Sequence, residues 1–153
     1  MSDAFRQSLW IAAPRDRVFA QFTDPARMVR WMGQAARLEP RPGGRFEVDI
    51  NGVLIRGHYL AVERPTLIEV AWGQAGNAAM PLGATRLRVE IAAAGAGSRL
   101  TLTHSGLVPD EAAKHAVGWP HFLERLRERA SGRDPGPDPW AKAPPEHGGE
   151  TSA

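Results

Sequence analysis

Residues 99–130, RLTLTHSGLVPDEAAKHAVGWPHFLERLRERA, decide the fold because an alternating strand runs directly into a long amphipathic helix. In residues 99–105, every second side chain is leucine or histidine, which is the period of a strand with one buried face. From Pro109 onward, apolar residues recur at spacings of three and four, which is the period of a helix with one buried face. The sequence therefore predicts a helix from Pro109 to about Ser131, kinked near Gly118 because Pro120 lacks an amide hydrogen.

Residues 35–106, which end with this strand, carry strand patterns separated by turn signals. Phe46 begins an alternation of apolar and charged residues, and Asn51-Gly52 ends it in a predicted tight hairpin turn, because both residues tolerate positive φ. Residues 5–11 predict one earlier strand, and residues 14–33 predict two short helices.

The predicted order is one strand, two short helices, about six strands and one long helix. Without crossover helices the strands cannot be parallel, so we expect an α+β fold. In it, a curved antiparallel sheet of about six or seven strands wraps around the C-terminal helix. Because a curved sheet and a straight helix cannot touch everywhere, we expect an apolar cavity between them. We expect one domain over residues 1–132 and a disordered, Pro/Gly-rich tail over residues 133–153.

Composition and charge exclude several classes of function. The chain has no cysteine, which excludes disulfides and thiolate chemistry and fits a reducing compartment. Its 19 Lys and Arg against 17 Asp and Glu form no concentrated basic face, so we expect no nucleic-acid partner. Neither a signal peptide nor a long apolar run is present, so we expect a cytoplasmic protein without membrane contact.

Several short motifs occur in a specific order between about Leu9 and Ala130. They are Ala13-Pro14, Thr23-Asp24-Pro25, Trp31, Pro42-Gly43-Gly44-Arg45-Phe46, Gly57, Pro65, Trp72, Leu100-Thr101-Leu102-Thr103-His104-Ser105-Gly106-Leu107 and Gly118-Trp119-Pro120. In this order the chain resembles the START-like (SRPBCC, helix-grip) superfamily and, within it, the homologues of the heat-shock chaperone ATPase activator. The resemblance implies a hydrophobic pocket between sheet and helix in a small-ligand binder. It does not imply chaperone activation, because the true activators carry a further amino-terminal domain.

His104 is the sharpest candidate for a polar contact, since the strand period turns it toward the cavity. A structural hydrogen bond would explain the same placement, and that reading is favoured for a single inward histidine. Arg56 and His58 also share one face of a strand; inward, they would bind an acidic ligand group, but we favour solvent contact because unpaired charges are rarely buried. His115 and His121 lie about 240° apart on a helix, so they cannot share a metal ion.

The candidate ligand-binding residues are those expected to face the cavity. They are Trp31, Phe46, Val48, Ile50, His58, Ile68, Val70, Trp72, Leu87, Val89, Leu100, Leu102, His104, Trp119 and Leu123. We assign no catalytic residue, metal or cofactor. The leading hypothesis is binding of a small hydrophobic or amphipathic molecule. The alternatives are a cyclase or dehydratase that uses His104 as acid or base, and a protein-interaction module such as a chaperone helper or homodimer.

Overall fold

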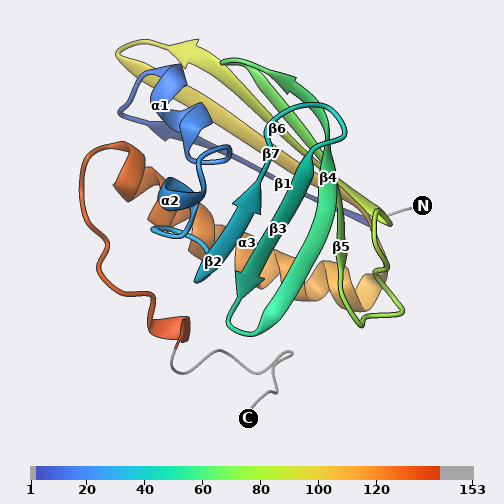
Figure 1. Ribbon diagram of the computed structural model, residues 1–153. Coiled ribbons are helices and arrows are strands. Elements are labelled where there is room, and N and C mark those ends of the chain that lie inside the picture. The colour runs from blue at the N-terminus through green and yellow to red at the C-terminus, as the bar shows by residue number, and fades with distance from the viewer. Residues whose placement is uncertain (1–2, 142–153) are drawn as a thin grey trace.

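The structure, a computed structural model, describes residues 3–141 and contains one long helix against one sheet (Figure 1). The elements along the chain are β1 (Asp3–Ile11), α1 (Arg15–Ala20), α2 (Pro25–Met28), β2 (Ala35–Leu38), β3 (Arg45–Ile50), β4 (Val53–Glu63), β5 (Leu67–Gln74), β6 (Thr85–Ala94), β7 (Gly97–Leu107), α3 (Pro109–Ala130) and the 3-10 helix η1 (Pro139–Ala141). This order confirms the predicted one, with six strands between the short helices and α3.

The sheet has seven antiparallel strands in the order β1-β7-β6-β5-β4-β3-β2. Sequential strands lie side by side except that β1 pairs with β7, which places the first and last strands together. Asn51, with φ of 54°, and Gly52, with φ of 90°, form the predicted turn between β3 and β4. Strand β6 runs to Ala94 and β7 begins at Gly97, and these two residues pair across a tight turn.

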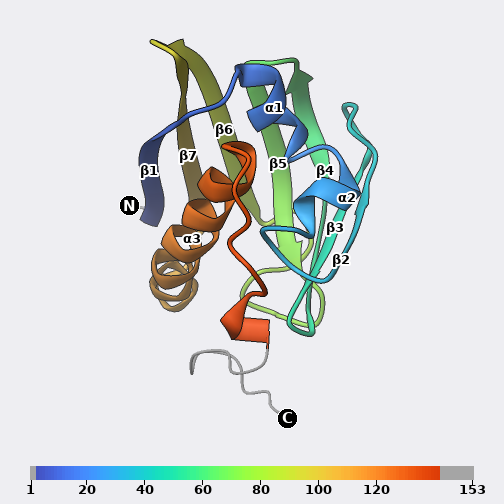
Figure 2. The same cartoon turned by 90° about the vertical axis from the view of Figure 1, so that its left-hand side faces the viewer.

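Helix α3 lies within the curve of the sheet, with β1 and β7 on one side and β2 and β3 on the other (Figure 2). It runs through Pro120 as one element. Asp110 and Glu111 lie in its first turn and Arg127 and Arg129 in its last, which suits the helix dipole at both ends. Among residues 3–141, no helix is long and apolar enough to cross a membrane.

The two faces of β4 are now distinguished. Ile55 and Tyr59 are buried, whereas Arg56 and His58 are exposed on the outer face. His58 therefore lies away from the interior and leaves the candidate set, because a charged or polar side chain with access to water stays in water. A register shift after Tyr59 explains why alternation alone could not decide between the faces.

Residues 133–141, expected as the start of a disordered tail, pack against α3 instead. Trp140 stacks on His121 of α3 with the ring centroids 3.6 Å apart and the planes 7° from parallel. Asp138 Oδ1 lies 2.8 Å from His121 Nε2 and accepts the backbone amide of Trp140. The rest of the expected tail, residues 142–153, lies outside the described residues.

Gly57 allows β4 and β5 to approach closely. A Cβ atom at this position would lie 1.7 Å from the carbonyl oxygen of Ala71, and that oxygen belongs to the neighbouring strand. We predict that Gly57→Ala lowers the free energy of unfolding by ~3 kcal/mol, because the backbone must move to relieve the overlap. Gly118→Ala is the control: nothing lies within 4 Å of its Cβ position, and alanine in the helix raises stability by up to about 1 kcal/mol. Urea denaturation measures both, and equal stability of the two variants would contradict the prediction.

Candidate functional site

Aromatic side chains from sheet and helix meet at one place between β5 and α3. The Trp72 ring is at the centre of this cluster, which we call the aromatic layer. Its centroid lies 5.8 Å from Phe46, 5.1 Å from His104, 5.5 Å from Trp119 and 6.2 Å from His115. Four of these rings belong to predicted inward positions. They are Phe46 on β3, Trp72 on β5, His104 on β7 and Trp119 on α3, where strand alternation and helical spacing turn them toward one another.

The other predicted inward positions surround the aromatic layer. Their side chains are buried in the same core: Val48, Ile68, Val70, Leu87, Val89, Leu100, Leu102 and Leu123. Ile50 lies at the end of β3 and is only partly buried. Trp31 belongs to a separate part of the core, where it packs edge-on against Phe22 and donates its indole N–H to Gln21 O.

His104 has a hydrogen-bond partner on each ring nitrogen. Trp119 Nε1, on α3, donates to Nδ1 at 3.1 Å. Nε2 lies 2.8 Å from Thr85 Oγ1, and the same hydroxyl donates to Trp72 O at 2.9 Å. Because the hydroxyl hydrogen goes to that carbonyl, the bond to Thr85 must be donated by His104 Nε2–H. His104 is therefore held as the neutral Nε2–H tautomer, which fits the structural reading of this residue.

The surroundings of His104 favour its neutral form. Burial lowers its pKa well below the ordinary value, and the nearby His115, whose ring centroid is 4.8 Å away, lowers that pKa further. A proton on Nδ1 would also break the bond from Trp119. Both effects make His104 a poor acid or base at neutral pH.

Trp72 Nε1 is a buried donor without a hydrogen-bond acceptor among the described residues. The residue is 2% exposed. The indole N–H groups of Trp10, Trp31 and Trp119 differ, since they donate to Ala94 O, Gln21 O and His104 Nδ1 respectively. A buried donor left unpaired costs roughly 1–3 kcal/mol. The aromatic layer therefore contains one polar atom that a bound molecule could satisfy.

Two other titratable side chains of the sheet, Tyr59 and Glu69, have partners of their own. Tyr59 donates to Phe22 O at 2.9 Å, and burial raises the pKa of its hydroxyl. Glu69 points to the outer face of β5, where Arg86 and Arg88 pair with it. The Tyr59 ring packs edge-on against Phe46 of the aromatic layer, with the centroids 5.6 Å apart, but its hydroxyl is used by Phe22 O.

Sequence reasoning missed Thr85 and underrated His115. Thr85 is the first residue of β6 and carried no pattern of its own. His115 lies one helical turn before Trp119, a spacing that did place the two on one side of the helix. His121 contacts Trp140 and Asp138 instead, and residues 3–141 contain no group of three or more side chains that could hold a metal ion.

We predict that the free energy of unfolding falls as the pH drops below about 6.5. The unfolded chain takes up a proton on His104 there, whereas the folded chain, whose pKa is lower, does not. The expected slope from this residue is about 1.4 kcal/mol per pH unit, down to the folded pKa. Urea denaturation between pH 7.5 and pH 5 measures it. His104→Gln should have a smaller slope, whereas the exposed His58→Gln should keep the original one; an unchanged slope in His104→Gln would refute the assignment.

Known structures share this architecture. The AHSA1-like protein of Rhizobium etli is 38% identical over 92% of this chain and 89% of that chain, with a TM-score of 0.72. CalU16 from Micromonospora echinospora, as a solution structure, is 27% identical over 93% of this chain and 71% of that chain, with a TM-score of 0.73. The Aha1 dimer from Colwellia psychrerythraea is 17% identical over 84% of this chain and 96% of that chain, with a TM-score of 0.74; that identity shows the fold alone.

No curated protein matches the chain. The family model described as Activator of Hsp90 ATPase homolog 1-like protein (AHSA1) matches residues 12–131, which include both short helices, the strands β2 to β7 and α3. With the 38% identical structure and the helix-grip fold, this match shows that the chain belongs to the AHSA1 family of the START-like superfamily.

Proposed function

We propose that this protein binds a small, mainly apolar molecule between the sheet and α3, and that Trp72 Nε1–H donates a hydrogen bond to it. The observation that carries this proposal is the buried, unpaired indole N–H at the centre of the aromatic layer. A ligand acceptor placed there would remove the cost of the unpaired donor. The family membership and the helix-grip fold support the same location.

The surroundings of Trp72 define the chemistry of such a ligand. Phe46 and Trp119 offer ring faces and edges, so a flat aromatic or polycyclic molecule would pack well against them. A single acceptor such as a ketone, ester or ether oxygen would face Trp72 Nε1. A carboxylate is disfavoured there because burial of an unpaired charge is costly.

Chemical change of the ligand is not part of this proposal. Both ring nitrogens of His104 are occupied by Thr85 and Trp119, so acid-base catalysis would first break a hydrogen bond that joins helix and sheet. Carrying or sensing a ligand requires no such step. Cytoplasmic location and pairing with a second copy stay predictions; a dimer is named for the Colwellia relative.

A matched pair of fluorescent probes tests the role of Trp72. Prodan is a naphthalene with a ketone oxygen, whereas N-phenyl-1-naphthylamine has a similar ring system without a carbonyl acceptor. We predict that Trp72→Phe weakens prodan binding about tenfold, because it removes one buried hydrogen bond, and changes N-phenyl-1-naphthylamine binding by less than about twofold. Fluorescence titration measures both dissociation constants.

The control for this experiment is Trp10→Phe. Trp10 is 39% exposed on β1 and lies outside the aromatic layer, so this variant should bind both probes as the original chain does. Failure of the original chain to bind either probe, or an equal loss of both in Trp72→Phe, would count against the proposal.

Access to the aromatic layer is expected where the loop 75–84 meets α3. Asn77 Nδ2 donates to Glu111 Oε2 at 3.0 Å, and the backbone oxygen of Glu111 lies 2.8 Å from His115 Nδ1. This contact therefore sits one helical turn from a ring of the layer. Met80, in the same loop, is buried in the core.

We predict that Asn77→Ala raises the association rate constant of N-phenyl-1-naphthylamine by about threefold or more, because it removes a hydrogen bond to a charged group that keeps the loop on the helix. Stopped-flow fluorescence measures the rate. The exposed loop residue Leu82 supplies the control: Leu82→Ala should leave the rate unchanged. If Asn77→Ala associates no faster than the original chain, the ligand enters by another route.

A further inference from the structure

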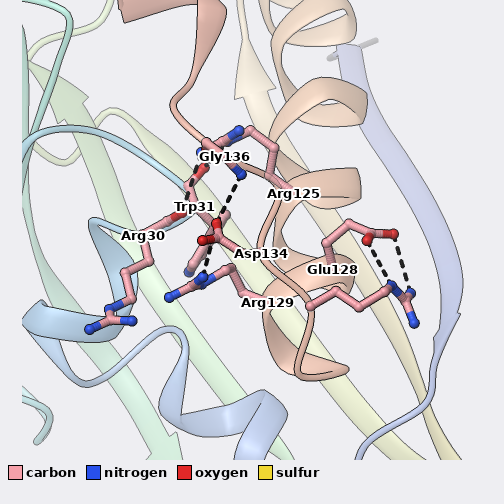
Figure 3. Close-up of polar contacts among 8 residues, drawn as sticks. Arg30, Trp31, Arg125, Glu128, Arg129, Asp134 and Gly136 are labelled. Atoms are coloured by element: carbon pink, nitrogen blue, oxygen red, sulfur yellow. Dashed lines mark hydrogen bonds and ion pairs between the residues drawn. The ribbon is translucent and has the colours of Figure 1, made fainter.

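A surface groove of about 390 Å³ lies between the second half of α3, the loop after α2 and residues 133–141. Arg125 and Arg129 extend into this region from α3, and Arg30 lines its opposite side with its side chain directed away from Arg125 (Figure 3). A second hollow of about 300 Å³ adjoins the groove, because Arg30 and Arg129 line both. We call the first hollow the arginine groove. None of the rings of the aromatic layer lines it.

Arg125 is a buried cation whose described partners are all backbone carbonyls. It is 9% exposed. Nε donates to Trp31 O at 3.3 Å, and Nη2 donates to Arg30 O at 3.3 Å and to Gly136 O at 3.0 Å (Figure 3). Nη1 donates to none of the described residues. These carbonyls satisfy part of the guanidinium but leave its positive charge without a counter-ion.

The carboxylates beside the groove have partners other than Arg125 and Arg30. Asp134, 78% exposed, pairs with Arg129 at 3.2 Å. Asp138 Oδ1 lies 2.8 Å from His121 Nε2, whereas its buried Oδ2, also in the groove lining, has no hydrogen-bond partner among the described residues. Arg30 is exposed and forms no ion pair with a described residue. Neither Arg125 nor Arg30, both of which line the groove, thus has a carboxylate partner among the described residues.

The groove also offers apolar surface next to these cations. Val29 and Pro137 line it, together with the edge formed by Ala141. A guanidinium pairs well with the planar oxygens of a carboxylate or phosphate group, and an apolar wall favours an organic substituent on that group. We infer that the arginine groove binds a small organic molecule carrying an oxyanion, with the oxyanion against Arg125 Nη1, Arg30 adding positive charge at the rim, and the apolar part against Val29 and Pro137.

Asp134 acts as an internal competitor for such a ligand. Its carboxylate holds the guanidinium of Arg129 at the rim, so an incoming oxyanion meets both a blocked donor and a negative charge. Removing that charge while keeping the side-chain shape should strengthen binding. The same substitution would have no such effect if Asp134 only served to hold residues 133–141 in place.

The test is a titration of the full chain with phenyl phosphate, benzoate, inorganic phosphate and acetate at constant ionic strength, followed by ¹H–¹⁵N NMR of the arginine side chains. We expect phenyl phosphate or benzoate to shift the Arg125 Nε–H signal and to bind more tightly than the inorganic phosphate or acetate that lacks the ring. Arg30→Gln should weaken binding on the order of tenfold, and Asp134→Asn should strengthen it severalfold. Arg37→Gln is the matched control, because it removes an equal charge from an exposed residue of β2 that forms no described ion pair.

Two outcomes would overturn the inference. Equal weakening in Arg30→Gln and Arg37→Gln would show only a general attraction of anions to the chain. If inorganic phosphate bound as tightly as phenyl phosphate, the apolar wall would contribute nothing to binding, and the inferred organic ligand would be wrong. Melting temperatures of the variants confirm that each is folded, and Trp72→Phe should leave phenyl phosphate binding unchanged, which separates this groove from the interior site.

Discussion

The hydrogen bond from Trp119 Nε1 to His104 Nδ1 joins α3 to β7, the strand next to the edge strand β1, and the aromatic layer is organised around it. Beyond His104, the chain of hydrogen bonds continues through Thr85 to the carbonyl of Trp72, so it crosses from α3 over β7 and β6 to β5. The donor of each of these hydrogen bonds is determined by the next bond in the series. Because Thr85 donates to Trp72 O, His104 Nε2–H must donate to Thr85, and His104 Nδ1 accepts from Trp119. His104 is thereby fixed as a neutral structural residue, and Trp72 Nε1 is the atom of the layer that finds no partner among residues 3–141.

The fold could be predicted from the sequence because its elements have clear periods. Alternation defines the inner face of β3 and β7, and helical spacing defines the buried face of α3. The errors have local causes. The alanine and glycine residues where β6 meets β7 carry no alternation of apolar and polar side chains, so the ends of these strands could not be located. In β4, a register shift between Tyr59 and Ala61 breaks the alternation. Residues 133–141 looked like a tail because Trp140 and Asp138 find their partner only in the folded chain.

The site could be predicted only in part. The inward direction of His104 follows from one strand, but its partners Thr85 and Trp119 come from two other elements, and no local pattern pairs them. The arginine groove was hidden for a similar reason. Arg125 resembles one more charged residue of an amphipathic helix, and its burial appears only when the carbonyl of Trp31, 94 residues earlier, lies beside it.

The central claim is that the indole N–H of Trp72 is the polar contact for an interior ligand. The five tryptophans of the chain give separate indole signals in a ¹H–¹⁵N NMR spectrum, which makes this donor directly observable. Addition of prodan should move the Trp72 indole proton downfield and slow its exchange with water, while the Trp10 indole signal stays in place. An unchanged Trp72 signal under saturating probe, with shifts confined to the arginine side chains of the groove, would contradict the account.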